Sequence, residues 1–92
     1  MYESELEKWC VKQAENAGYL TYKFDRLGGK KGWPDRGLWG PKGRHYLVEF
    51  KRPGEKPSPL QKHIHARFLS SGHTVHVIRS KKGFLGLLGI TG

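Results

Sequence analysis

The 92-residue chain has few acidic residues, one cysteine and no long hydrophobic run. Because Cys10 stands alone, it cannot form an internal disulfide, which is typical of a protein in a reducing compartment. The longest apolar run, GFLGLLGI, is far shorter than the roughly 20 residues that span a bilayer. The N-terminal MYESELEK has neither the basic nor the apolar region of a signal peptide. We therefore expect a soluble, cytoplasmic protein without a membrane partner.

The scarcity of acids leaves a strongly basic chain. Seventeen Lys and Arg face eight Asp and Glu, a formal net charge of +9. Such an excess predicts attraction to a polyanion, with nucleic acid favoured over a membrane surface. The segment GGKKGW lacks the Gly-Lys-Ser/Thr ending of a P-loop, so no nucleotide cofactor is expected. The length predicts a single domain, residues 1–92, whose thin core would gain stability from dimerisation.

The hydrophobic pattern predicts an α/β fold with the element order α-β-β-β-α-β and a final helix. Apolar residues at spacings of three and four predict helices, alternation predicts strands, and the Ser58-Pro59 pair is a typical helix start. The expected helices are 3–17, 59–71 and 81–90, and the expected strands are 19–25, 36–40, 44–51 and 74–78. The turn GPKG would join the second and third strands into a hairpin. The result would be a mixed four-stranded sheet flanked by helices.

Two of the scarce acids lie on this hairpin, in the segments GWPD and VEFK. Alternation places Glu49 and Lys51 on one face of a strand, with Val48 and Phe50 turned toward the core. Asp35, at the foot of the neighbouring strand, would lie close to Glu49. Two carboxylates in a basic background suit Mg²⁺, which prefers oxygen ligands and commonly takes one or two carboxylates. Such an ion can polarise a phosphoryl oxygen, activate a water and neutralise a leaving oxyanion.

Lys51 would stand beside that ion, where it could hold the attacking water or offset charge on the phosphate. The plainer alternative is a surface salt bridge between Glu49 and Lys51, with Asp35 as an ordinary turn residue after a proline. The combination of Pro-Asp, a hairpin and an apolar-flanked Glu-x-Lys favours the functional interpretation. A strand that packs inward does not present a merely solvated charged edge.

These motifs also carry a family resemblance. GWPD with VEFK resembles the PD-(D/E)XK nuclease signature, and the flanking LEKWCVKQAENAGY and SPLQ resemble its VRR-NUC (virus-type replication–repair nuclease) branch. The likeness covers nearly the whole chain and implies a restriction-endonuclease-like core in a stand-alone, phage-like member, acting in the host cytoplasm if phage-encoded. It implies Mg²⁺ or Mn²⁺ held by Asp35, Glu49 and the Phe50 carbonyl, and products with 5′-phosphates.

The resemblance implies a further acid on the first helix, and the candidates are Glu3, Glu5 and Glu7. Glu5 shares its face with basic residues and is expected to be solvated. Glu7 shares a face with Cys10, on the side expected to pack on the sheet, and it precedes Gly18 by the spacing that the resemblance suggests. We therefore favour Glu7 as a catalytic and metal-binding residue, with Glu3, one turn earlier on a similar face, as the alternative.

The resemblance also assigns Gln61 to the active site, where its amide could bond a water or a phosphate. The alternative is an amide that merely ties the helix to the sheet. The histidines do not suggest zinc, because His63 and His65 diverge on a helix and no Cys-x-x-Cys accompanies them.

A basic track is expected to bind DNA through its phosphates, although an ordinary basic loop has the same composition. Its predicted members are Arg26, Lys30, Lys31, Arg36 and Arg44. Trp33 and Trp39 could stack on a base, whereas core packing is the commoner role of tryptophan.

The sequence as a whole predicts a Mg²⁺- or Mn²⁺-dependent DNA endonuclease. We expect a homodimer that acts on branched DNA such as a four-way junction, with GFLGLLGI or the first helix as the interface. The alternatives are a non-catalytic nucleic-acid-binding module on the same fold and a nonspecific nickase.

Overall fold

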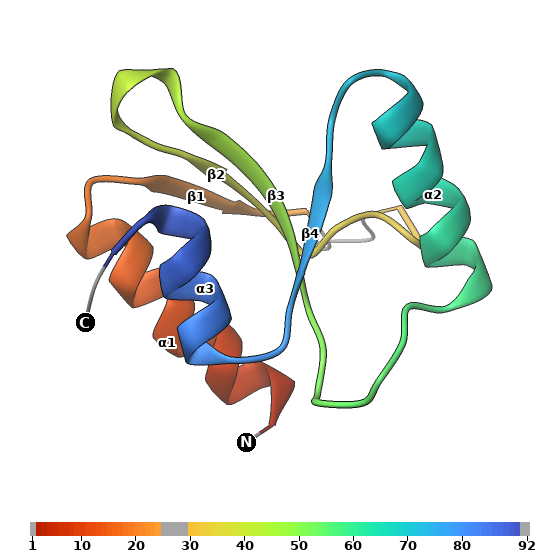
Figure 1. Ribbon diagram of the computed structural model, residues 1–92, viewed down its shortest axis with the longest axis horizontal. Helices are drawn as coiled ribbons and strands as arrows, with labels where there is room; N and C mark the ends of the chain where they lie inside the picture. Colours follow the sequence, from red (N-terminus) through yellow and green to blue (C-terminus); the bar gives the residue numbers. More distant parts are fainter. Residues whose placement is uncertain (1, 25–29, 91–92) are drawn as a thin grey trace.

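Four strands form one mixed sheet in the computed structural model, which describes residues 2–24 and 30–90 (Figure 1). The strands are β1 (Leu20–Lys23), β2 (Arg36–Trp39), β3 (His45–Phe50) and β4 (Val75–Ile78), and the sheet order is β1-β2-β3-β4. The first three strands are antiparallel neighbours, and β4 runs parallel to β3. A short 3-10 turn, η1 (Pro41–Gly43), closes the β2–β3 hairpin. The predicted mixed four-stranded α/β fold is confirmed.

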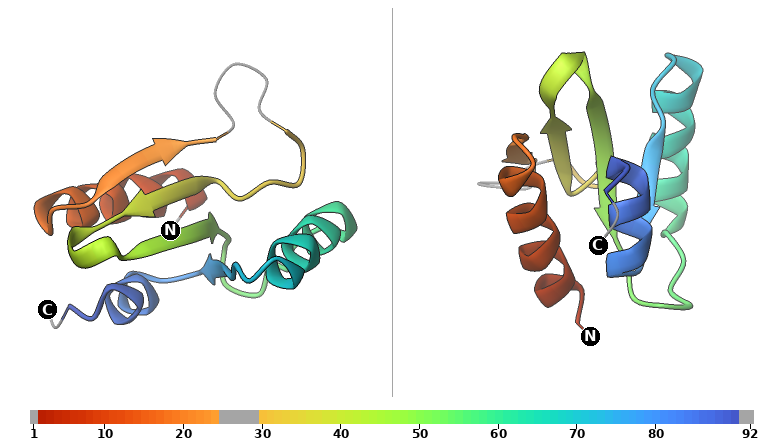
Figure 2. Two further views of the ribbon diagram at one scale, coloured as in Figure 1. Left: turned by 90° about the horizontal axis from the view of Figure 1, so that it is seen from above. Right: turned by 60° about the vertical axis from the view of Figure 1, so that its left-hand side comes forward.

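Three helices cover the two faces of this sheet. Helices α1 (Glu3–Asn16) and α3 (Lys81–Leu88) lie side by side on one face, and α2 (Pro59–Ser70), which connects β3 to β4, lies on the other (Figures 1 and 2). Within the described ranges, no helix is long and apolar enough to cross a membrane.

The hydrophobic core fills the space between the sheet and the α1–α3 pair. Its buried members are Leu6, Cys10, Ala14, Tyr19, Leu38, Val48, Phe50, Ile78, Phe84 and Leu88. Val48 and Phe50 turn to this face, as the alternation of β3 predicts. Alternation then sends Glu49 to the opposite face, toward α2.

That opposite face is covered only in part among the described residues, because α2 packs against β4 while large side chains of β1 and β2 remain exposed. Leu20, Tyr22 and Trp39 are exposed on these two strands. The rings of Trp39 and Phe24 pack over Gly37, which has no side chain. A Cβ at this position would lie 2.4 Å from the Trp39 ring and 2.8 Å from Phe24. Aromatic residues therefore spread over the face of the sheet that also holds Glu49.

Candidate active site

Asp35 is fixed against the end of β3 by two hydrogen bonds. Its backbone N–H donates to the Val48 carbonyl at 3.0 Å, and its Oδ2 accepts from the Phe50 N–H at 2.7 Å. The side chain of the preceding Pro34 is fully buried, and the proline ring fixes the backbone just before β2. The Asp35 carboxylate thus lies beside the segment Glu49–Phe50.

Glu49 is a wholly buried carboxylate, with 0% of its surface exposed. Within the described part of the chain, neither Oε1 nor Oε2 has a hydrogen-bond partner. Burial raises the pKa of Glu49, and the nearby acids Glu3 and Glu55 act in the same direction, whereas Lys51 opposes them. Because a buried carboxylate without partners is costly, this position calls for a ligand that supplies positive charge.

Lys51 extends β3 beyond its last assigned residue, because its N–H donates to the Ile78 carbonyl at 3.0 Å. Alternation places its side chain on the same face as Glu49. Its positive charge lowers the pKa of Glu49 and also that of His65 on α2. The predicted grouping of Asp35, Glu49 and Lys51 is therefore present at the end of β3.

His65 belongs to this group as well, although sequence reasoning considered it only as a zinc ligand. Its Nε2 lies 3.5 Å from Glu49 Oε1 and has no hydrogen-bond partner among the described residues. Burial lowers the pKa of His65, and Lys51 adds to that effect, while Asp35 opposes it. A sequence signal existed, because His65 lies one helical turn after Gln61, in the helix that follows the Glu-x-Lys strand.

The first-helix acid favoured from the sequence, Glu7, is not brought to Glu49. Its Oε2 accepts from Arg36 Nε at 2.7 Å and lies 3.7 Å from Lys23 Nζ. Arg36 is the β2 partner of Val48, so its side chain points to the α1 face. Glu7 and Glu49 consequently lie on opposite faces of the sheet.

Glu3, the alternative to Glu7, lies closer to the candidate site. A hydrogen bond with Glu55 raises the pKa of Glu3, and burial and the negative charge of Glu55 add to the rise, while Lys51 and Arg52 oppose it. Glu3 in turn contributes to the raised pKa of Glu49. The N-terminus of α1 therefore reaches the cluster at the end of β3, one turn before the position that the helix-face argument selected. Glu5 is exposed, as expected.

Gln61 completes a capping box at the start of α2, whose N-cap residue is Ser58. The Ser58 N–H donates to Gln61 Oε1 at 2.8 Å, and the Gln61 N–H donates to Ser58 Oγ at 3.2 Å, which is a capping box. The side-chain carbonyl is thereby engaged in starting the helix, a role that differs from both the active-site amide and the tie to the sheet that the sequence suggested.

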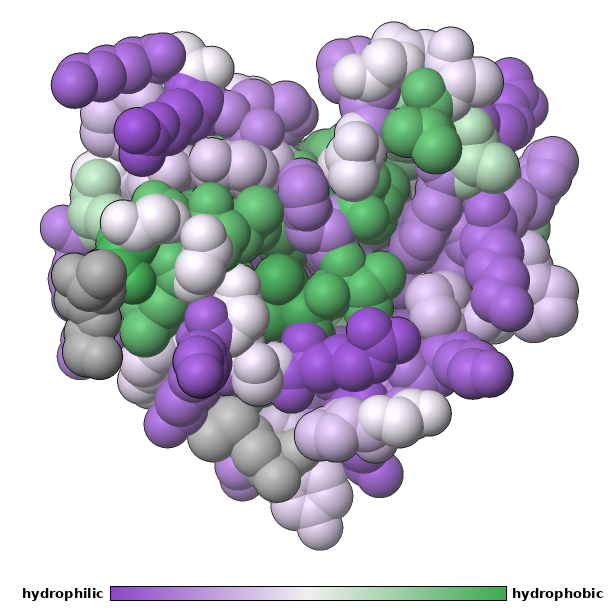
Figure 3. Space-filling model, viewed as in Figure 1, coloured by the Kyte–Doolittle hydropathy of each residue, from purple (hydrophilic) through white to green (hydrophobic). Residues whose placement is uncertain are grey.

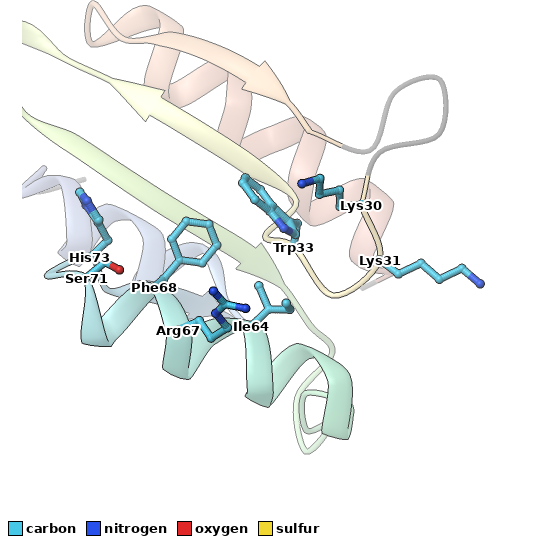
Figure 4. A pocket seen from close by; sticks show the side chains of 8 residues that line it. All are labelled: Lys30, Lys31, Trp33, Ile64, Arg67, Phe68, Ser71 and His73. Carbon is cyan, nitrogen blue, oxygen red and sulfur yellow. The ribbon is translucent and has the colours of Figure 1, made fainter.

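The predicted basic track divides in the structure. Lys30 and Lys31 line a cavity of about 470 Å³ next to α2, where Arg67 joins them (Figure 4). Arg36 instead faces Glu7, and Arg44 is exposed immediately after η1, at the far end of the hairpin. Arg26 lies outside the described residues. Arg67 is thus a basic residue that sequence reasoning missed.

The residues at the end of β3 fit a hard divalent cation. Across residues 2–24 and 30–90, no cluster of three or more His, Cys, Asp or Glu side chains is arranged to hold a metal. Asp35 and Glu49 nevertheless supply two carboxylates, the type of protein ligand that Mg²⁺ commonly takes. The Glu49 oxygens, which have no hydrogen-bond partner among the described residues although His65 Nε2 lies 3.5 Å from Oε1, support this fit.

The chain is similar to known proteins over most of its length. The model of the VRR-NUC domain family matches residues 3–82. The chain belongs to the VRR-NUC family. "Putative nuclease p44" of Acyrthosiphon pisum secondary endosymbiont phage 1 is 42% identical over 79 residues, 86% of this chain and 84% of that protein. A solved VRR-NUC domain shares 32% identity at a TM-score of 0.84, over 95% of this chain and 94% of the other.

A second solved structure, described as a VRR-NUC domain protein, shows the same fold at 17% identity. Its TM-score is 0.75, over 97% of this chain and 86% of the other. The VRR-NUC resemblance identified in the sequence is therefore confirmed for family and fold.

Proposed function

We propose that this VRR-NUC protein is a Mg²⁺- or Mn²⁺-dependent DNA endonuclease. The observation that carries the proposal is Glu49, a carboxylate with 0% exposure and no hydrogen-bond partner among the described residues, beside Asp35 and Lys51. The family match and the name of the phage relative support nuclease activity. The net charge of +9 supports a nucleic-acid substrate.

Asp35, Glu49 and the Phe50 carbonyl would hold the ion. A divalent cation bound there would supply Lewis-acid chemistry at the phosphoryl oxygen and would make water a stronger nucleophile at neutral pH. Lys51, on the face of Glu49, offsets the negative charge that develops on the phosphate. Glu3, rather than Glu7, would act as the first-helix acid at the periphery of this site, because its charge raises the pKa of Glu49 whereas Glu7 faces Arg36 and Lys23. The cleaved strand would carry a 5′-phosphate.

The DNA backbone would approach through Lys30, Lys31 and Arg67, the cations of the cavity beside α2. This cavity adjoins the candidate site along the chain, because Trp33 precedes Asp35 by two residues and Ile64 precedes His65 by one. Arg36 would contribute less than the sequence suggested, since its charge is already matched by Glu7.

The proposed active form is a homodimer on branched DNA. Phe84 and Leu88 of α3 are buried in the core, but Leu85, Leu87 and Ile90 remain partly exposed. In Figure 3, hydrophobic residues gather over α3 and are bordered by hydrophilic ones. A second copy on this patch would bury apolar surface and place two sites on two strands of a junction.

A combined cleavage and binding experiment tests the proposal. Linear, flapped and four-way DNA are incubated with wild-type protein in Mg²⁺, in Mn²⁺ and in EDTA, and metal binding is followed through the melting temperature. A metal at one hundred times its Kd should stabilise the fold by about 2.7 kcal/mol. We expect metal-dependent cleavage, fastest on four-way DNA, and no metal-induced stabilisation of Glu49→Gln or Asp35→Asn.

DNA binding without cleavage in either metal would favour a non-catalytic binding module. Equal cleavage of linear and four-way DNA would favour a nonspecific nickase. A sedimentation mass of 10.5 kDa at micromolar concentration would remove the dimer.

A further inference from the structure

We propose that the cavity between α2 and residues 30–33 binds one unpaired nucleobase of the DNA substrate. This inference rests on the proposed DNA-cleaving function and names the feature of the substrate that the site selects. The cavity measures about 470 Å³, within the usual range of small-molecule pockets. Its lining residues are Lys30, Lys31, Trp33, Ile64, Arg67, Phe68, Ser71 and His73.

Two aromatic rings form a corner of this cavity. Trp33 and Phe68 project toward each other from the segment before β2 and from α2 (Figure 4). Their centroids are 5.0 Å apart with planes at 80°, so a flat ligand can stack on one ring while it meets the edge of the other. Lys30 Nζ lies 5.6 Å from the centroid of Trp33. Sequence-tolerant stacking on aromatic side chains is a common way of binding unpaired bases.

The charges around the aromatic corner identify the ligand class. Lys30, Lys31 and Arg67 carry positive charge, and none of the described lining residues is acidic. Ser71 and His73 add hydrogen-bonding groups suited to the polar edge of a base. An apolar ligand would not need the cations, and a bare phosphate would not need the two rings. A nucleotide within a nucleic-acid chain matches both features.

The cavity is built into the fold beside the candidate site. Gly32 has a positive φ of 82°, and a Cβ there would lie 2.9 Å from atoms of both Leu60 and Ile64. The backbone at Gly32, which forms part of the cavity wall, therefore packs directly against α2. On the same two elements, Asp35 follows Trp33 by two residues, and His65, beside Ile64, approaches Glu49 at 3.5 Å. A base in the cavity would thus belong to a nucleotide near the cleaved bond.

This arrangement gives a reason for structure selectivity. A base within a duplex must lose its pairing and stacking to enter such a cavity, at a cost of a few kcal/mol. A base at a gap or in an unpaired flap has already lost its pairing, so it enters the cavity at a lower cost than a base of a fully paired arm.

The test uses binding alone, with wild-type protein in EDTA so that no cleavage occurs. The probe is 2-aminopurine, a fluorescent base, placed either as a single unpaired nucleotide at a branch or in the middle of a fully paired duplex of equal length. We expect tighter binding of the branched probe, with a stacking-dependent change of its fluorescence. Trp33→Leu should weaken that binding about 5- to 150-fold, the contribution of one stacked base, and should change duplex binding little.

Two further variants keep the test decisive. Ser71→Phe fills the cavity from an exposed position without removing a packed ring and should have the same effect as Trp33→Leu. Trp39→Leu, at an exposed tryptophan that does not line the cavity, is the matched control and should bind like wild type. Circular dichroism melting confirms that each variant is folded.

The inference is overturned if the branched and paired probes bind equally, or if folded Trp33→Leu and Ser71→Phe both bind the branched probe as wild type does. Failure to bind any DNA at low salt would overturn the proposed function together with the inference. Selective base binding without cleavage in metal would support the inference and count against the endonuclease.

Discussion

Two glutamates on opposite faces of the sheet show how differently this chain treats its scarce acids. Glu7 lies on the α1 face with 14% of its side chain exposed, and Arg36 and Lys23 both meet its Oε2. Glu49 lies on the α2 face with no exposure and no hydrogen-bond partner among the described residues. The chain carries a net charge of +9, so basic side chains are plentiful. The more deeply buried Glu49 nevertheless lacks, in the described part of the chain, the hydrogen-bond donors that Glu7 has.

This difference suggests that Glu7 has a structural role and that Glu49 binds a ligand. A partly buried ion pair such as Glu7–Arg36 contributes modestly to stability and needs nothing further. A buried carboxylate without donors destabilises the fold until a cation or a proton reaches it. Such a group is a strong candidate for function, particularly when a second carboxylate, Asp35, is held beside it.

The largest expected difference in cleavage rate is the one between Glu49→Gln and Glu7→Gln. Glu49→Gln should reduce metal-dependent cleavage by about 10²–10³-fold, the scale seen when one electrostatic group is removed from an active site. Glu7→Gln should leave cleavage within a few-fold of wild type. Initial rates on four-way DNA at saturating Mn²⁺ measure both. Severe loss in Glu7→Gln with near-normal Glu49→Gln would reverse the assignment.

A smaller effect distinguishes the two acids of α1 that sequence reasoning weighed against each other. Glu3→Gln should reduce cleavage by roughly tenfold, as expected of a residue that tunes a metal site from its periphery, because the charge of Glu3 reaches Glu49. Glu5→Gln, at an exposed position on the same helix, is the matched control and should not change the rate. If Glu7→Gln is slower than Glu3→Gln, the helix acid is Glu7 after all.

The comparison also predicts a difference in stability. Glu49→Gln should be more stable than wild type at neutral pH by about 1–2 kcal/mol, because a neutral amide costs less to bury than a carboxylate. Since the folded-state pKa of Glu49 is raised, protonation of this group favours folding. The stability that protonated Glu49 contributes to the wild-type protein is fully present below the unfolded-state pKa. It is lost as the pH rises through the folded-state pKa.

The advantage of Glu49→Gln over wild type should therefore widen as the pH rises from acidic values toward neutrality. Urea unfolding of both proteins in EDTA, from pH 4 to pH 8, measures the difference. Because His65 Nε2 lies 3.5 Å from Glu49 Oε1, the titration of His65 does not cancel between the two proteins, and the comparison is repeated in a His65→Ala background. A constant difference across this range would show that Glu49 titrates as it does in the unfolded chain.

Much of the fold was predictable because its signals are local. The alternation around Val48 and Phe50 and the Ser58-Pro59 helix start each depend on a few neighbouring residues, and both gave the observed elements. The capping box of Gln61 was also readable, since Ser-x-x-Gln at a helix start is its sequence signature. The family resemblance instead assigned the Gln61 amide to the active site.

The parts of the site that sequence reasoning missed depend on long-range placement. The pattern of α1 gives the face of Glu7 but not which strand residue stands opposite, and that residue is Arg36, 29 positions away. The contact between His65 and Glu49 likewise requires the position of α2 on the sheet. For the same reason Arg36 was assigned to the phosphate track, whereas the fold gives it a carboxylate partner.

The smallest expected effect is on the salt dependence of DNA binding. It compares two residues of the predicted basic track, Lys31 beside the cavity and Arg36 beside Glu7. Each phosphate contact contributes about 0.9 to the slope of log K against log salt. Lys31→Gln should therefore lower the slope for duplex binding by about 0.9, because Lys31 lines the cavity beside the candidate site. Arg36→Gln should leave the slope nearly unchanged, since Glu7 already matches the charge of Arg36. Fluorescence anisotropy titrations in EDTA at four salt concentrations give both slopes. Equal reductions in the two variants would mean that DNA draws Arg36 away from Glu7, and the α1 face would then belong to the binding surface.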